Sequence, residues 1–102
     1  MINVYIKHPG HPPFACLVQN TLKALQKLVS GRIETIPIFE DLIILCNEEG
    51  RLLDLPYNCE CCGIDFVGTI VLVGVDGEEF DSVPATREQL IKLFPKLWEV
   101  PA

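Results

Sequence analysis

The sequence contains five cysteines, and these are the side chains best suited to chemistry: Cys16, Cys46, Cys59, Cys61 and Cys62. Their number is odd and the N-terminus lacks the pattern of a signal peptide, so we expect free thiols in place of a disulfide framework. Cys59 and Cys62 form a C-x-x-C step followed by Gly63, which is the spacing of a zinc knuckle. Two thiolates would supply half of the four ligands that a structural zinc ion requires.

The other ligands of such a zinc site would have to come from Cys61, from a partner subunit, or from His8 and His11. The sequence has no second C-x-x-C, and free cysteine commonly behaves as a small buried apolar residue. We therefore predict no resident metal or other cofactor. A small zinc-binding structural or regulatory module that uses Cys59 and Cys62 remains the alternative.

Three pairs of adjacent carboxylates could also suggest catalysis: Glu40-Asp41, Glu48-Glu49 and Glu78-Glu79. Neighbouring residues on a strand point to opposite faces, so two adjacent acids rarely converge on one reacting atom. Turns of this composition lie at the surface, and solvated turns account for all three pairs. The sequence also lacks a phosphate-binding loop, a nucleophile elbow and a zinc-protease helix. We predict that the protein is not an enzyme, with an enzyme of unrecognised type as a further alternative.

Length and charge limit the fold and the partners. A chain of 102 residues, 49% of them hydrophobic, suits a single domain spanning residues 1–102. A net charge of -6 provides no attraction to nucleic-acid phosphates, but it is compatible with docking on a basic protein surface. No apolar run approaches the length of a membrane span. We expect a location in the cytoplasm of a bacterial host cell, with neither nucleic acid nor membrane as partner.

Hydrophobic patterning predicts the elements of the first half of the chain. Strands are expected at residues 1–7, 14–18, 32–38 and 42–46, the last of them covered on both faces. Pro37 indicates an edge strand or a bulge. A helix that begins at Asn20 or Thr21 has an apolar stripe and should end at Ser30-Gly31, where glycine can adopt the left-handed conformation.

In the second half, residues 47–50 suit a turn that leads into a strand at residues 51–55. Residues 66–75 predict the strongest strand, and Asp76-Gly77 is a hairpin signal before a strand at residues 78–83. A capping box at residues 86–89 opens a short C-terminal helix, after which Leu97 and Trp98 should cover the core. The predicted fold is α+β, with a mainly antiparallel sheet of about five to six strands, one longer helix and one short helix.

Four segments together resemble a known family: the helix NTLKALQKLVSGRIETIPI, the strand and turn LIILCNEEG, the segment LPYN, and FVGTIVLVGVDGEEF. Their combination is similar to a family of uncharacterised small domains carried by bacteriophages, plasmids and bacterial genomes, especially of Firmicutes. Its most specific features are the CNEEG turn, the LPxN segment and the VGT strand. The resemblance implies a mobile-element setting and brings no enzyme activity with it.

An exposed recognition face is the function that these features favour. Its candidate binding residues are Asn47, Glu48, Glu49, Tyr57 and Asn58, in which tyrosine offers a stacking surface and asparagine a donor and acceptor pair. Turn chemistry alone also accounts for each of these residue types. We expect a non-enzymatic binding protein of a phage or mobile element, with a counter-defence role. Its partner would be a host protein or a small signalling molecule, and its oligomeric state, a homo-oligomer included, is left open.

Overall fold

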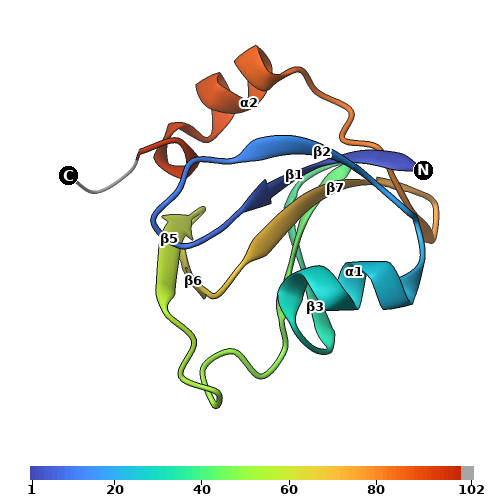
Figure 1. The fold of residues 1–102 in the computed structure, drawn as a ribbon. Helices are drawn as coiled ribbons and strands as arrows, with labels where there is room; N and C mark the ends of the chain where they lie inside the picture. The colour runs from blue at the N-terminus through green and yellow to red at the C-terminus, as the bar shows by residue number, and fades with distance from the viewer. Residues whose placement is uncertain (100–102) are drawn as a thin grey trace.

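The computed structural model describes residues 1–99 as an α+β fold (Figure 1). Its strands are β1 (Ile2–Lys7), β2 (Phe14–Val18), β3 (Ile33–Phe39), β4 (Leu42–Asn47), β5 (Tyr57–Cys61), β6 (Ile64–Val67), β7 (Ile70–Asp76) and β8 (Glu79–Asp81). Its helices are α1 (Leu22–Val29), α2 (Arg87–Leu93) and the short 3-10 turn η1 (Pro95–Leu97). No helix within this range is long and apolar enough to cross a membrane.

The main sheet has the strand order β2-β1-β7-β4-β3, and β8 pairs with the C-terminal end of β7. Each of its described pairings is antiparallel, which confirms the predicted sheet type. Strands β5 and β6 form a separate two-stranded hairpin, also antiparallel. The sequence did not predict this hairpin as a unit of its own.

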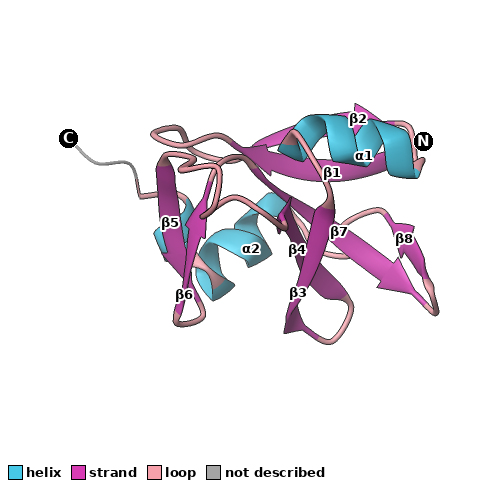
Figure 2. Ribbon diagram, turned by 90° about the horizontal axis from the view of Figure 1, so that it is seen from below, coloured by secondary structure: helices cyan, strands magenta, loops and turns pink. Residues whose placement is uncertain are grey.

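Two layers cover the main sheet, one on each face (Figures 1 and 2). Helix α1 packs on one face through Leu25 and Val29, which join a cluster with β1, β4 and β7. On the other face, α2, η1 and the β5–β6 hairpin pack against alternate residues of β4 and β7. The side chains of β4 are buried throughout, as the continuous apolar run predicted for a strand covered on both faces.

The residue that ends α1 in the left-handed conformation differs from the predicted one. Thr21 caps the start, and its side chain accepts a hydrogen bond from the Ala24 N–H. At the other end, Ser30 adopts the left-handed conformation that we expected of Gly31. Gly31 is required for space instead, since a Cβ there would lie 2.8 Å from Asn47 Nδ2. The predicted contrast between one longer and one short helix is not confirmed, because α1 has eight residues and α2 has seven.

The strand predicted at residues 51–55 is wrong. This segment folds on itself through local bonds, from Leu53 N to Glu49 O and from Leu55 N to Gly50 O, and so forms successive turns. The single strand predicted at residues 66–75 is instead divided between β6 and β7. Gly68 has a φ of +72° and a Cβ there would meet Leu55 at 2.7 Å, so the chain bends where the apolar pattern continues.

Other local predictions are confirmed. Strand β3 is an edge strand, and its pairing shifts register between Pro37 and Phe39. Strands β7 and β8 form the hairpin signalled by Asp76-Gly77. Thr86 and Gln89 make both bonds of the capping box at α2.

Candidate functional site

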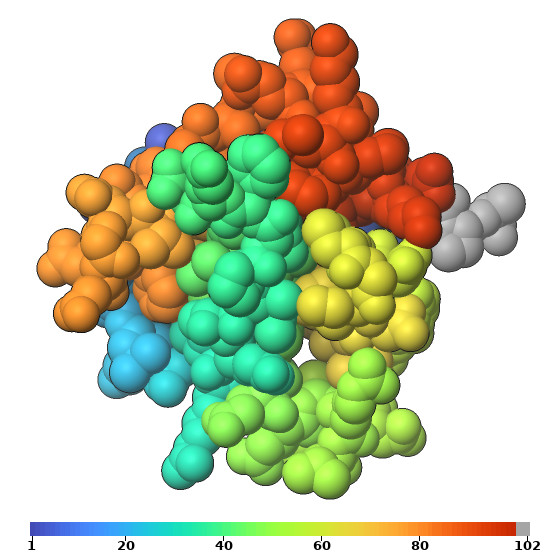
Figure 3. All heavy atoms as spheres, turned by 180° about the vertical axis from the view of Figure 1, so that it is seen from behind, coloured from blue at the N-terminus to red at the C-terminus, as the bar shows by residue number. Residues whose placement is uncertain are grey.

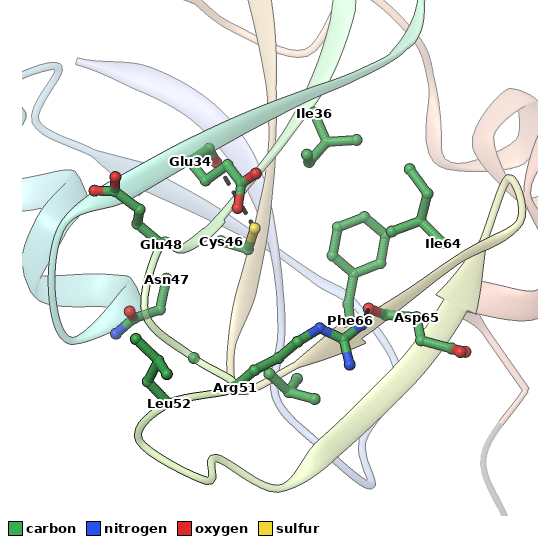
Figure 4. A pocket seen from close by; sticks show the side chains of 12 residues that line it. Glu34, Ile36, Cys46, Asn47, Glu48, Arg51, Leu52, Ile64, Asp65 and Phe66 are labelled. Atoms are coloured by element: carbon green, nitrogen blue, oxygen red, sulfur yellow. Dashed lines mark hydrogen bonds between the residues drawn. The ribbon is translucent and has the colours of Figure 1, made fainter.

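A cavity of about 220 Å³ opens between β3, the end of β4, the turns that follow it, and β6. Figure 3 shows the hollow bordered by the surfaces of these segments, and Figure 4 shows its side chains. Twelve residues line it: Glu34, Ile36, Cys46, Asn47, Glu48, Gly50, Arg51, Leu52, Ile64, Asp65, Phe66 and Val67. The site therefore joins segments that are well separated in the sequence.

The floor of the cavity is apolar because of strand register. Glu34 pairs with Cys46 and Ile36 pairs with Ile44, so these four side chains share the face of the sheet that the hairpin covers. Phe66 of β6 is buried against this face. The β5–β6 hairpin leaves part of the edge strand uncovered, and the cavity lies over that part.

Charged groups enter the cavity from two elements. Figure 4 shows the Glu34 carboxylate pointing inward from β3 and the Arg51 side chain reaching in from the turn after β4, beside the Phe66 ring. Arg51 Nη2 donates to the Asp65 carbonyl oxygen at 2.9 Å, which leaves most of its donors available. Within residues 1–99 the ion pair is that of Lys96 with Glu60, so Glu34 and Arg51 face the cavity without forming one.

The thiol in the cavity is held in its neutral form. Cys46 Sγ donates to the Glu34 carbonyl oxygen at 3.8 Å. Burial, and secondarily the charge of Glu34, raises the pKa of Cys46 to about 11. A thiol with this pKa is a weak nucleophile near neutral pH, because the thiolate is the reactive form. Cys46 is thus not activated as a nucleophile in this cavity.

A family model described as "Domain of unknown function (DUF3846)" matches residues 2–95. The chain belongs to this family. The membership confirms the resemblance to an uncharacterised domain family. No curated protein and no solved structure matches the chain.

In this DUF3846 domain, the predicted binding residue Asn47 lines the cavity but its amide is already engaged. Its Nδ2 donates to the carbonyl oxygens of Val29 at 3.0 Å and Ser30 at 3.2 Å. Its Oδ1 accepts a hydrogen bond from Glu49 N at 2.8 Å. Asn47 therefore ties the last turn of α1 to β4 and shapes the turn that carries Arg51.

Asn58 is buried away from the cavity. Its Nδ2 donates to the carbonyl oxygens of Lys7 and Gly68, at 2.9 and 2.7 Å. Its Oδ1 accepts from Lys7 Nζ at 2.7 Å, and Lys7 is itself only 1% exposed. Asn58 thus connects β1, β5 and the bend before β7, and does not contribute to an exposed face.

The other predicted binding residues are exposed. Glu48 lies on the cavity rim with its carboxylate turned outward (Figure 4), and Glu49 lies in the adjoining turn. Tyr57 donates its hydroxyl to Asp65 Oδ1 at 3.1 Å and does not line the cavity. The predicted set therefore does not form one face, and the structure brings only Asn47 and Glu48 to the cavity.

The sequence missed Glu34, Ile36, Arg51 and Phe66 as site residues. Glu34 and Ile36 lie on β3, Arg51 lies in the turn after β4, and Phe66 lies on β6. Only the register of β3 with β4 and the position of β6 bring them together. The expectation of a strand at residues 51–55 also concealed Arg51, which a turn places at the cavity.

The cysteines that the alternative zinc site would use lie in the β5–β6 hairpin. Cys59 and Cys61 are buried in the core, whereas Cys62 is exposed in the turn. The closest sulfurs belong to Cys61 and Cys62, at 3.8 Å. His8 Nδ1 is hydrogen-bonded to Thr69 Oγ1 at 2.8 Å. Across residues 1–99, no group of three or more His, Cys, Asp or Glu side chains is placed to hold a metal ion.

Proposed function

We propose that this DUF3846 domain is a non-enzymatic binding protein of a bacteriophage or other mobile element, acting against host defence in the bacterial cytoplasm. Its recognition site is the cavity between β3, β4 and β6. The observation that carries the proposal is the arrangement of Glu34 and Arg51 around an apolar floor, where neither has an ion-pair partner among residues 1–99. Small binding sites commonly combine an apolar lining with a few placed polar groups.

The chemistry of the cavity supports binding without reaction. The Cys46 thiol has a pKa of about 11, and the Asn47 amide is occupied by the end of α1. The charged groups that remain can orient a ligand. The partner is a small signalling molecule or a host protein that inserts one group into the cavity, and the exposed Leu52 beside it would add contact area.

Capture from host cells tests this function. Tagged protein would be purified from a bacterial host, and the proteins and small molecules released by denaturation would be measured by mass spectrometry. The variant Glu34→Lys reverses the inward carboxylate. Glu78→Lys makes the same charge change in the β7–β8 hairpin and is the matched control.

We expect at least one released species to fall about tenfold or more in Glu34→Lys and to stay unchanged in Glu78→Lys. A tenfold change corresponds to about 1.4 kcal/mol of binding free energy. If every captured species is insensitive to Glu34→Lys, the cavity is not the recognition site. Plaque counts on a host with an active defence system, with and without the protein, would test the counter-defence role.

A further inference from the structure

We propose that the cavity binds a small zwitterion of the α-amino acid class, with an apolar side chain. This inference rests on the proposed binding function and names its ligand. The ammonium group would lie against the Glu34 carboxylate and the carboxylate against the Arg51 guanidinium. The side chain would contact Ile36 and Phe66.

The pairing of charges selects this ligand class. A purely cationic ligand would be attracted by Glu34 but repelled by Arg51, and a purely anionic ligand would meet the reverse. A zwitterion satisfies both groups at once. Arg51 suits a carboxylate because its planar guanidinium offers parallel donors. Among the residues that the structure describes, it makes one hydrogen bond, to the Asp65 carbonyl oxygen.

The other carboxylates near the cavity do not change this balance. Asp65 accepts the Tyr57 hydroxyl at 3.1 Å, and its side chain points away from the cavity in Figure 4. The Glu48 carboxylate also turns outward there. The inward charges are therefore one negative group from β3 and one positive group from the turn after β4.

Size and polarity agree with a ligand of few atoms. The volume of about 220 Å³ is below the roughly 300–1,000 Å³ of pockets for drug-sized ligands. The floor between the two charged groups is formed by Ile36, Phe66 and the neutral Cys46 thiol. An aliphatic side chain would remove this apolar surface from water, which favours leucine-like ligands over polar amino acids.

Calorimetric titration with three matched probes tests the proposal: L-leucine, 3-methylbutylamine, which lacks the carboxylate, and 4-methylpentanoate, which lacks the ammonium group. We expect leucine to bind and each single-charge probe to bind at least tenfold more weakly. Glu34→Gln should weaken leucine binding without strengthening the amine. Arg51→Gln should bring the affinity for leucine down to that for the amine. Glu78→Gln, outside the cavity, should leave every affinity unchanged, and circular dichroism would confirm that each variant is folded.

The outcomes separate this proposal from the function it rests on. Equal binding of leucine and 3-methylbutylamine would show that Arg51 does not recognise a carboxylate, which overturns the zwitterion but leaves a binding cavity. The same holds if no leucine binds while capture from host cells still depends on Glu34. If no leucine binds and capture from host cells does not depend on Glu34, the cavity is not a recognition site.

Discussion

Lys7 is a buried cation whose described hydrogen bond is to a neutral amide. Its Nζ donates to Asn58 Oδ1, and its own carbonyl oxygen accepts from Asn58 Nδ2. Loss of hydration lowers the pKa of Lys7 from its usual 10.5, and the nearby Cys59 thiol acts in the opposite direction. Burying an ammonium group costs free energy unless it is paired, so this residue should make stability depend on pH.

The variant Lys7→Met measures that dependence. In the wild type the unfolded chain holds the Lys7 proton more tightly, so the Lys7 contribution to the free energy of unfolding rises with pH between the lowered folded pKa and 10.5. Burial raises the pKa of Cys59 and Lys7 lowers it, so Lys7→Met raises the folded pKa of Cys59 further. This change alters the difference between the two proteins in the same direction, because a raised thiol pKa makes stability fall with pH. We therefore expect the wild-type minus Lys7→Met difference in urea-unfolding free energy to increase from pH 7 to pH 10.

Lys23→Met is the control, because Lys23 is exposed on α1. Its difference from the wild type should not follow this pH trend. Methionine at position 7 also leaves Asn58 Oδ1 without its Lys7 donor, but that loss adds an offset that does not vary with pH. If the wild-type minus Lys7→Met difference in unfolding free energy does not change with pH, burial does not lower the pKa of Lys7.

The residue types at the site were visible in the sequence, but their roles were not. Asn47 and Asn58 were predicted as binding groups because asparagine offers a donor and an acceptor, and the same property lets them satisfy buried carbonyl groups. Which of these roles applies depends on burial, and both side chains are 6% exposed. Glu34 carried no signal because a single acid on a strand is ordinary until a partner strand and a cavity are placed beside it.

At the scale of elements, α1 depends on β4 for its C-terminal end. Asn47 from β4 donates to two carbonyl groups of the last turn, Ser30 takes the left-handed conformation, and Gly31 leaves room for the amide. Carbonyl groups at the end of a helix otherwise lack partners. The helix is short, so a tie from a buried strand should contribute much of its local stability.

Asn47→Asp tests this tie with a change of few atoms. The carboxylate cannot donate to the Val29 and Ser30 carbonyl oxygens, and its charge is unfavourable beside the negative end of the helix. We expect the free energy of unfolding to fall by about 2–3 kcal/mol in urea titrations at pH 7. Asn3→Asp, an exposed site, adds the same charge and should change it by less than about 0.5 kcal/mol. Equal losses in the two variants would contradict the tie.

Elements with a regular apolar period or a local cap could be predicted, and those set by tertiary contacts could not. Strand β4 and the α2 capping box followed from short sequence patterns. The bend at Gly68 lies inside an apolar run, and it arises from close packing against Leu55. Strand β5 carries the cysteine cluster, whose spacing suggested a zinc knuckle although Cys59 and Cys61 face the core from the same side of a strand.

At the scale of the whole molecule, the two faces of the main sheet contribute side chains to two separate apolar clusters. Val71 faces α1 and its neighbour Leu72 faces the layer of α2 and the β5–β6 hairpin, and both are fully buried. The strands of the site, β3, β4 and β6, therefore belong to the main sheet or pack against it. The central strands of that sheet, β4 and β7, contribute side chains to both clusters. A substitution that destabilises the packing on one face should therefore lower the stability of the packing on the other face as well.

Val71→Ala and Leu72→Ala test this coupling with adjacent residues that point to opposite faces. Each leaves a cavity, and we expect losses of about 2 kcal/mol for Val71→Ala and about 3 kcal/mol for Leu72→Ala. Trp98 packs against the Leu72 side, so its fluorescence reports that layer, whereas far-ultraviolet circular dichroism reports the whole sheet. In both variants the two signals should give the same urea midpoint, as a single cooperative unit requires. If Val71→Ala shifts the dichroism midpoint and leaves the Trp98 midpoint in place, the layer of α2 and the hairpin unfolds separately from the sheet, and the two faces are not coupled.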